Sequence, residues 1–195
     1  DAISGKGRDC PVLDGAISLD AFWGDHEGAA YAPEPVAPED IALLQYTGGT
    51  TGVPKAAVLT HGNLGAAVQI YRENSTSDPA FDPGRSTLLY SPLFHVMGLT
   101  SMLLRRTHEG GRLHIRQRFD PAEAMKDIEE HRIASFTSVP TAWIAILQLP
   151  EVETRDFSSL EFIASGGAPL PVEVFNRVRK LTGLKLRGGW GMTET

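Results

Sequence analysis

The sequence predicts an α/β fold, in which a mainly parallel β-sheet carries helices on both faces. Two observations predict it. From residue 41 onward, short apolar segments bounded by turns alternate with helix-length amphipathic segments. These segments follow one another at the spacing of strand–helix–strand units, whose strands run parallel because the chain returns through a helix. Sheets of this kind bind ligands at the carboxyl ends of their strands, so the functional residues are expected there.

The first forty residues differ in composition from the rest of the chain. They are rich in glycine, proline and acidic residues, and residues 31–38 alone contain three prolines. Such a composition predicts a helical or irregular connector, with a helix or two around Leu19 to Trp23. We therefore expect two parts, a connector over residues 1–40 and an incomplete α/β subdomain over residues 41–195.

Five apolar segments are predicted to be strands: Ile41 to Tyr46, Ser86 to Tyr90, Leu113 to Ile115, Ala134 to Val139 and Leu160 to Ala164. Polar or glycine-rich residues follow four of them. These residues are Thr47-Gly48-Gly49, Phe94-His95, Pro140-Thr141 and Ser165-Gly166-Gly167. Because the carboxyl ends of parallel strands meet at one edge of a sheet, we expect the four groups to gather there.

Two helices have clear start signals. Asp120 offers a capping side chain, Pro121 suits the first helical position, and Glu123 places a carboxylate three residues after the cap. A second helix is expected to open at Pro171 and to end at Gly183, because glycine adopts the left-handed conformation that closes many helices.

Charge and composition exclude several classes of function. The 195 residues are 42% hydrophobic and carry a formal charge of −6, which offers no broad positive surface for nucleic acid. Arg105 and Arg106 are predicted to lie at a solvated helix end. Since no segment reaches ~18 consecutive apolar residues, any membrane contact would be peripheral, at the inner face of the membrane. The single cysteine, Cys10, fits a reducing compartment, so a cytoplasmic location is expected.

The segment from Tyr46 to Lys55 has the parts of a phosphate-binding loop. Glycines let the backbone bring N–H groups close to a polyanion, threonines add hydroxyl donors, and Lys55 adds a mobile positive charge. These residues are Thr47, Gly48, Gly49, Thr50, Thr51, Gly52 and Lys55. The spacing differs from that of the common NTPase loop, because Val53 and Pro54 separate the last glycine from the lysine. The alternative is a flexible hairpin loop of this composition by chance.

This run, continued through His61 to Asn63, resembles the signature loop of the ANL superfamily of adenylate-forming enzymes. That superfamily includes acyl-CoA synthetases, adenylation domains of peptide synthetases and luciferases. Three further segments resemble its motifs in the same order: Ser91 to Leu99, Ser165 to Leu170 and Gly189 to Thr195. The sequence from Leu44 to Gly49 is most similar to that of the long-chain fatty acid CoA ligases. The resemblance implies part of the large N-terminal domain of an acyl-CoA synthetase.

The resemblance also implies site residues. The loop from Thr47 to Lys55 would hold the ATP phosphates, with Lys55 acting in catalysis. The segment from Ser165 to Leu170, with Gly166, Gly167 and Ala168, would line the adenine and acyl sites. In the last segment, Trp190 would stack on adenine, Thr193 would bond near the α-phosphate and Glu194 would bind Mg²⁺. Its remaining members, Gly189, Gly191 and Met192, would complete the nucleotide site.

His95 resembles the histidine that lies beside the acyl carboxylate in this superfamily. Without that match, a lone histidine after an apolar strand is more often structural. The other histidines show no metal-ligand spacing. Three positions depart from the pattern of many members: Gly49 replaces a serine, Ala56 a glycine and Trp190 a tyrosine. The exchange at Gly49 removes one possible phosphate donor.

The implied reaction is the activation of a carboxylic acid, expected to be a fatty acid, with ATP and then transfer to coenzyme A. Two alternatives remain open, namely a non-catalytic nucleotide-binding module and an enzyme for an aryl, short-chain or amino acid. In the superfamily, a ribose-binding aspartate and a mobile C-terminal domain follow the last motif. We therefore expect that the 195 residues do not turn over by themselves. The oligomeric state cannot be deduced from the sequence.

Overall fold

The computed structural model describes residues 21, 23, 24, 28, 30, 32–47, 54–76 and 85–194, without the side chains of 74–76. The chain divides into two units, Asp1–Pro35 and Val36–Thr195, and the second contains the sheet. Most of the helix predicted around Leu19 to Trp23 lies outside the described residues. The same is true of residues 48–53 of the predicted phosphate loop and of Thr195.

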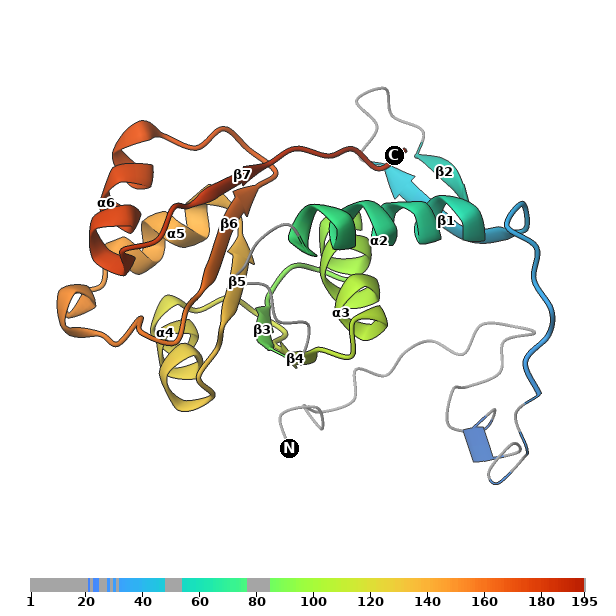
Figure 1. Ribbon diagram of the computed structural model, residues 1–195, viewed down its shortest axis with the longest axis horizontal. Helices are drawn as coiled ribbons and strands as arrows, with labels where there is room; N and C mark the ends of the chain where they lie inside the picture. The colour runs from blue at the N-terminus through green and yellow to red at the C-terminus, as the bar shows by residue number, and fades with distance from the viewer. Residues whose placement is uncertain are drawn as a thin grey trace. The chain divides into compact units, whose positions relative to one another are not determined.

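The second unit is built on a five-stranded sheet whose paired strands are all parallel (Figure 1). Its strands are β3 (Ser86–Leu89), β4 (Arg112–Ile115), β5 (Ser135–Ser138), β6 (Phe162–Gly166) and β7 (Arg187–Gly189), in the order β4-β3-β5-β6-β7. The predicted α/β class is confirmed, and four of the five predicted strands belong to this sheet.

The fifth predicted strand belongs elsewhere. β1 (Ile41–Thr47) pairs antiparallel with β2 (Lys55–Thr60) in a separate two-stranded sheet, so its assignment to the parallel sheet is wrong. The connection explains the difference, because only the seven residues 48–54 separate the two strands. A parallel crossover needs about a dozen residues or more, whereas a hairpin needs only a few.

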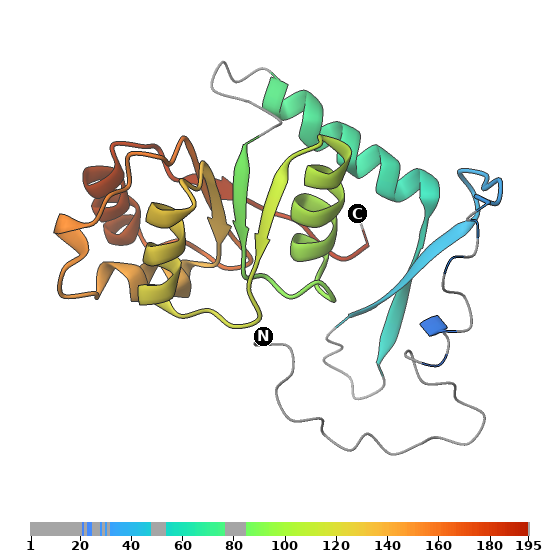
Figure 2. The same cartoon turned by 90° about the horizontal axis from the view of Figure 1, so that it is seen from below.

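Helices cover both faces of the five-stranded sheet, and the path of the chain explains their sides. The chain passes from β3 to β4 through the π-helix η1 (Met97–Leu104) and α3 (Arg105–His108). It then returns past β3 to β5 through α4 (Pro121–Glu130). It continues in the same direction to β6 through α5 (Pro140–Leu147) and η2 (Val152–Thr154), and to β7 through α6 (Val172–Thr182). Right-handed crossovers in opposite directions place helices on opposite faces. Accordingly, α3 lies on one side and α4 to α6 on the other (Figures 1 and 2).

Helix α2 (His61–Thr76) follows β2 directly and contacts η1, which joins the hairpin to the rest of the second unit. In the described parts of the chain, no helix is long and apolar enough to cross a membrane.

The predicted helix boundaries are confirmed. The Asp120 side chain accepts hydrogen bonds of 2.9 Å from the backbone N–H groups of Ala122 and Glu123, which caps α4. Pro121 is the first helical residue. Gly183 ends α6 in the left-handed conformation, with φ at 74°.

The prediction for Arg105 and Arg106 is wrong, because both are buried. Arg105 Nε lies 2.9 Å from Glu109 Oε1, and Arg106 Nη1 lies 3.0 Å from Glu109 Oε2. One carboxylate three and four residues further along the helix thus pairs with both guanidinium groups.

The core lies between the sheet and the α4–α6 side. Leu88, Phe136 and Ile163 come from three adjacent strands and pack with helix side chains such as Trp143. The Trp143 ring meets Phe136 edge to face at a centroid distance of 5.1 Å. Its Nε1–H donates a 3.1 Å hydrogen bond to the Ala164 carbonyl, which fixes α5 against β6. These contacts hold α5 at the strand ends where the pocket lies.

Candidate active site

The strand order of the sheet reverses direction between β3 and β5. These two strands are neighbours, but the chain leaves β3 toward one face and leaves β5 toward the other. Their connections therefore diverge and leave a crevice beyond the carboxyl ends of the strands. Ligands of open α/β sheets bind at such a switch point.

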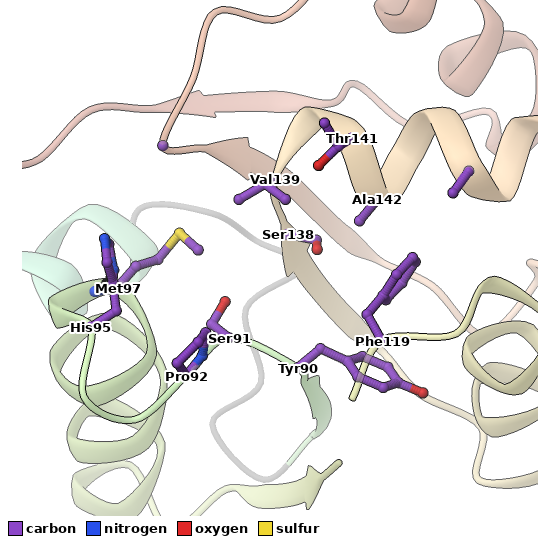
Figure 3. A pocket seen from close by; sticks show the side chains of 12 residues that line it. Tyr90, Ser91, Pro92, His95, Met97, Phe119, Ser138, Val139, Thr141 and Ala142 are labelled. Carbon is purple, nitrogen blue, oxygen red and sulfur yellow. Dashed lines mark hydrogen bonds between the residues drawn. The ribbon is translucent and has the colours of Figure 1, made fainter. Parts of the chain in front are cut away.

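A pocket of about 450 Å³ lies at this crevice (Figure 3). Its lining comes from the last residue of β5, from the segments that follow β3, β5 and β6, and from Phe119 just before α4. The full lining is Tyr90, Ser91, Pro92, His95, Met97, Phe119, Ser138, Val139, Thr141, Ala142, Ala145 and Gly167. The structure thus brings together His95, Thr141 and Gly167, which the sequence placed after three different strands.

Helix α5 forms one wall of the pocket. Thr141, Ala142 and Ala145 line the pocket from one face of this helix, and the last two have only methyl side chains. Pro140 occupies the first helical position, where its fixed φ favours the helix and its missing N–H is not needed. The helix therefore starts immediately after β5, and its small side chains leave room for an apolar group.

Gly166 and Gly167 allow a close approach of three segments. A β-carbon on Gly166 would lie 3.2 Å from the Gly189 carbonyl oxygen and 3.7 Å from Met97 Sδ. Gly167 has φ at +79°, a conformation that favours glycine, and a β-carbon there would lie 3.5 Å from Val139 Cγ1. Met97, Gly166 and Gly189 come from three of the segments that resemble ANL motifs, so these segments meet in space.

His95 lies in the loop between β3 and η1, at one end of the pocket lining (Figure 3). Its backbone N–H bonds to the Pro92 carbonyl at 3.0 Å. The Met97 N–H donates a 3.2 Å hydrogen bond to Nδ1 of the His95 ring. A neutral ring that accepts at Nδ1 carries its proton on Nε2, where it can donate to an anionic ligand.

The hairpin reaches the same region through a buried side chain. Gln45 on β1 donates a hydrogen bond from Nε2 to the Phe94 carbonyl, next to His95. At the loop end of the hairpin, Thr47 pairs with Lys55, and the Thr47 hydroxyl donates to the Lys55 carbonyl at 3.2 Å. These two residues flank the part of the predicted phosphate loop, residues 48–53, that lies outside the described residues.

The structure does not place every predicted residue at the pocket. Lys55, Trp190, Thr193 and Glu194 are absent from its lining, as are Ala168, Gly189, Gly191 and Met192. Trp190 follows β7 at the same edge of the sheet, and its side chain is 84% exposed. Within the described ranges, no group of three or more His, Cys, Asp or Glu side chains is gathered to hold a metal ion.

Tyr90 and Phe119 are pocket residues that the sequence did not reveal. Tyr90 ends a predicted strand, and Phe119 directly precedes the capping Asp120. Their rings meet edge to face with centroids 5.2 Å apart. The sequence signal for these two residues is an aromatic side chain at a strand end and another just before a helix cap. Aromatic residues at such positions do not indicate a pocket by themselves.

Behind Tyr90 lies a buried carboxylate, Asp127 on α4. The Tyr90 hydroxyl donates to Asp127 Oδ2 at 3.2 Å, and Arg116 Nε donates to the same oxygen at 2.8 Å. Burial opposes the ionised form of Asp127, but Arg116 and the Tyr90 hydroxyl outweigh it and hold the pKa of Asp127 below its usual value. Burial, and then the Asp127 charge, raise the pKa of Tyr90, so its hydroxyl stays protonated.

Comparison with known proteins gives a family match over most of the chain. The family described as AMP-binding enzyme matches residues 6–195. The long-chain-fatty-acid–CoA ligase of Bacillus subtilis strain 168 is 39% identical over 155 residues, which cover 80% of this chain and 27% of that protein. The feruloyl-CoA synthase of an Amycolatopsis species is 38% identical over 161 residues, which cover 82% and 32%. The chain therefore spans about a third or less of the length of these relatives.

A solved structure supports the fold. The ATP-bound structure of MatB from Rhodopseudomonas palustris superimposes with a TM-score of 0.77 at 27% identity, covering 90% of this chain and 34% of that chain.

Proposed function

The chain belongs to the family of AMP-binding enzymes, and we propose that it forms part of an ATP-dependent carboxylic acid:CoA ligase. Such an acid–thiol ligase forms an acyl-adenylate and then an acyl-CoA thioester. The observation that carries the proposal is the pocket at the switch point between β3 and β5, where three segments of the family pattern meet.

We assign the pocket to the acyl group of the substrate. Most of its lining is apolar, and its polar side chains include His95, Ser138 and Thr141. A volume of about 450 Å³ lies within the range of small-molecule sites, which combine apolar walls with a few placed polar groups. The Nε2–H of His95 is the group that would meet the substrate carboxylate, because Nδ1 is already used by Met97. The tail of the acid would then lie along α5.

The nucleotide is assigned to the segments around the pocket. The loop from Thr47 to Lys55, with Gly48, Gly49, Thr50, Thr51 and Gly52, would bind the phosphates through backbone N–H groups, hydroxyls and one ammonium group. The exposed indole of Trp190 offers a face on which adenine can stack. Gly166, Gly167 and Ala168 would separate the acyl and nucleotide sites, with Gly189, Gly191 and Met192 on the nucleotide side.

The proposed reaction needs no protein nucleophile. A carboxylate oxygen attacks the α-phosphorus, the bond to the pyrophosphate oxygen breaks, and pyrophosphate leaves with its electron pair. The thiol sulfur of coenzyme A then attacks the acyl carbon and AMP leaves. Lys55 would offset phosphate charge, and Thr193 would donate a hydrogen bond near the α-phosphate, so the protein contributes positioning and charge stabilisation.

Glu194 is the residue we assign to Mg²⁺. Its side chain is exposed at the end of the segment that follows β7. One carboxylate suits this ion, which usually keeps several waters and is otherwise held by substrate phosphates. When bound, the ion would neutralise charge that develops on the leaving pyrophosphate.

We propose a fatty acid as the substrate, with an aromatic acid as the second candidate. The aliphatic part of the lining, including Met97, Val139 and Ala142, suits an alkyl chain. The edge-to-face pair of Tyr90 and Phe119 would equally suit an aromatic ring, and relatives named for both kinds of acid are of nearly equal identity.

A chimera tests the proposal. Residues 41–194 would replace the matching segment of the Bacillus subtilis ligase, and ATP–pyrophosphate exchange would be measured with alkyl, aryl and amino acids. We expect exchange with fatty acids, whereas the 195 residues alone should bind MgATP without exchange. A folded chimera that binds ATP but exchanges with none of the acids would instead favour a non-catalytic nucleotide-binding module.

A further inference from the structure

Tyr90 and Phe119 form the end of the pocket that lies opposite His95 (Figure 3). Tyr90 directly follows β3, and Phe119 lies between β4 and α4, so two paired parallel strands bring the residues together. Their rings meet at 83°, which presents the edge of one ring to the face of the other. The α5 wall beside them is lined by smaller side chains, with Ala145 one turn beyond Thr141.

The Tyr90 ring is fixed from behind. Its hydroxyl bonds to Asp127 Oδ2 at 3.2 Å, and the same carboxylate is bound by Arg116 through both Nε and Nη2. Asp127 is 3% exposed, so water cannot readily replace its hydrogen-bond partners. A carboxylate held by a bidentate arginine is a fixed acceptor. The ring cannot turn out of the pocket without breaking this bond to a buried charge.

We propose that Tyr90 is a specificity-determining residue: its ring, anchored by Asp127, closes this end of the pocket and limits the length of the apolar chain bound there. The proposal rests on the proposed function, since it treats the pocket as the acyl site. An alkyl chain that passed the ring would meet the Asp127–Arg116 pair. Apolar groups cannot satisfy such charges, so that position excludes a longer chain.

The length of the pocket can be measured without the carboxylate. Primary n-alkanols of increasing length would be titrated into the 195-residue chain by calorimetry, while methyl signals of Ala142 and Ala145 are followed by NMR in ¹³C-alanine-labelled protein. Each methylene that enters the pocket should raise the affinity by about fourfold. The increase in affinity should stop at the chain length at which the alkanol reaches Tyr90. Every alkanol up to that length should change the chemical shifts of both methyl groups.

Three variants test the role of Tyr90. Tyr90→Ala should move the limit to longer alkanols, and Tyr90→Leu should move it in the same direction if the alanine variant does not fold. Tyr90→Phe keeps the ring but removes the bond to Asp127, so its limit should also lengthen. Tyr71 on α2 supplies matched controls, because it lies outside the pocket lining and packs on Arg105 instead. Tyr71→Ala and Tyr71→Phe should keep the wild-type limit.

The outcomes separate this proposal from the proposed function. A limit that stays at the wild-type length in Tyr90→Ala and Tyr90→Leu would overturn the end-stop, whatever acids the chain binds. Unchanged methyl signals of Ala142 and Ala145 with every alkanol would overturn it as well. A limit that lengthens only in Tyr90→Ala, and not in Tyr90→Phe, would overturn the anchoring by Asp127. Carboxylates that bind no tighter than alkanols of equal length would count against the acyl site itself, while the alkanol limit would still decide the end-stop.

Discussion

Gly98, the second residue of η1, packs directly against the carbonyl group of Pro92. A β-carbon on Gly98 would lie 2.9 Å from the Ser91 carbonyl oxygen and closer still to that of Pro92. This contact folds the His95 loop back on the start of the π-helix. Only a residue without a side chain fits, so the glycine sets the position of one pocket wall.

Gly98→Ala should therefore lower the free energy of unfolding by about 1–3 kcal/mol, the cost of forcing an extra carbon into a packed site. Urea denaturation followed by circular dichroism measures the change. Gly65→Ala is the matched control, because Gly65 lies within α2 and a β-carbon there meets nothing within 4 Å. It should be neutral or stabilising by up to about 1 kcal/mol. Equal effects of the two substitutions would show that backbone contact is not the cause.

The Trp143 side chain fixes the pocket helix α5 to the sheet. Trp143→Phe removes the 3.1 Å hydrogen bond to the Ala164 carbonyl and part of a fully buried ring. The expected loss of unfolding free energy is about 1–3 kcal/mol, from the lost packing and the lost buried hydrogen bond. Trp190→Phe, at an exposed position, should change the unfolding free energy by less than about 0.5 kcal/mol in the same assay. A Trp143 variant as stable as that control would contradict this role.

The elements that were predicted correctly have signals within the element itself. The start of α4 depends on Asp120 and Pro121, which act within one turn of the helix. The end of α6 depends on Gly183, which supplies its own backbone conformation. The strands β3, β5 and β6 are buried along most of their length, because both faces of a parallel sheet are covered, and each contributes an apolar residue to the core.

The missed strands, β7 and β2, depend on the strands with which they pair. β7 has the sequence Arg187-Gly188-Gly189, which has low strand propensity, and it forms because it pairs with Ala164 to Gly166 of β6. No strand is predicted over Lys55–Thr60, and β2 forms there because it pairs with β1 across the hairpin. In β7 the partner strand outweighs the local preference.

The candidate site was only partly predictable for the same reason. His95 and Gly167 follow their strands, so their shared edge could be expected from parallel order alone. The contact between Tyr90 and Phe119 depends on the pairing of β3 with β4. The hydrogen bond that anchors Tyr90 depends on the position of Asp127 on α4. Tyr90 and Asp127 are 37 residues apart in the sequence, so no local sequence pattern predicts their hydrogen bond.

Asp120 offers a direct test of a boundary that the sequence predicted. Asp120→Ala removes the acceptor of two backbone N–H groups at the start of α4, and the unfolding free energy should fall by about 1 kcal/mol. Asp120→Asn keeps a side-chain acceptor and should retain most of the stability. If the asparagine variant loses as much as the alanine variant, charge rather than capping is responsible.

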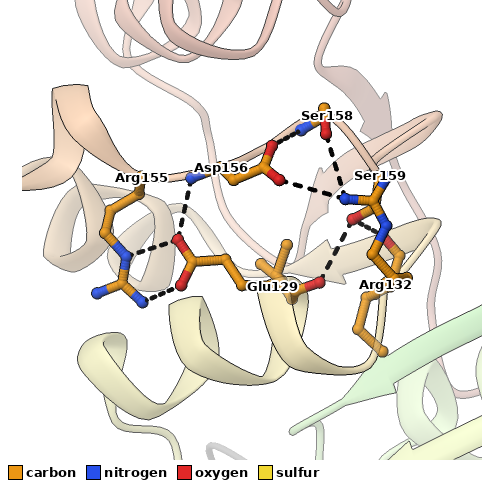
Figure 4. A network of polar contacts seen from close by, with 8 residues as sticks. Glu129, Arg132, Arg155, Asp156, Ser158 and Ser159 are labelled. Atoms are coloured by element: carbon orange, nitrogen blue, oxygen red, sulfur yellow. Dashed lines mark hydrogen bonds and ion pairs between the residues drawn. The ribbon is translucent and has the colours of Figure 1, made fainter.

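Glu129 should make stability depend on pH in the acid range. Its carboxylate accepts two hydrogen bonds from Arg155, at 2.7 and 2.6 Å, and one from the Asp156 N–H (Figure 4). The hydrogen bonds from Arg155 lower the pKa of Glu129 below its ordinary value. A carboxyl whose pKa is lower in the folded state stabilises that state above the unfolded pKa of about 4.3, and this contribution is lost as the pH falls through the folded pKa.

Glu129→Gln should thus cost about 0.5–1 kcal/mol at pH 7 and progressively less as the pH falls below about 4. Urea denaturation between pH 7 and pH 2.5 measures the difference. Glu130→Gln, at the exposed neighbouring position on α4, should change little across this range. A Glu129→Gln deficit that stays constant with pH would mean that packing, and not ionisation, explains the loss.

Trp190 provides a direct test of the nucleotide assignment. Trp190 is 84% exposed, whereas Trp143 is 1% exposed and out of reach of a ligand. A base that stacks on the Trp190 ring should therefore quench the fluorescence of Trp190 and leave that of Trp143 unchanged. Titration with MgATP should show this quenching, and Trp190→Phe should abolish it while keeping much of the affinity. Trp190→Ala should weaken MgATP binding by about 5- to 150-fold, since stacking on one aromatic side chain contributes roughly 1–3 kcal/mol. Trp23→Phe, at another exposed tryptophan, should retain the quenching. If quenching persists in Trp190→Phe and disappears in Trp23→Phe, the adenine does not bind on the segment that follows β7.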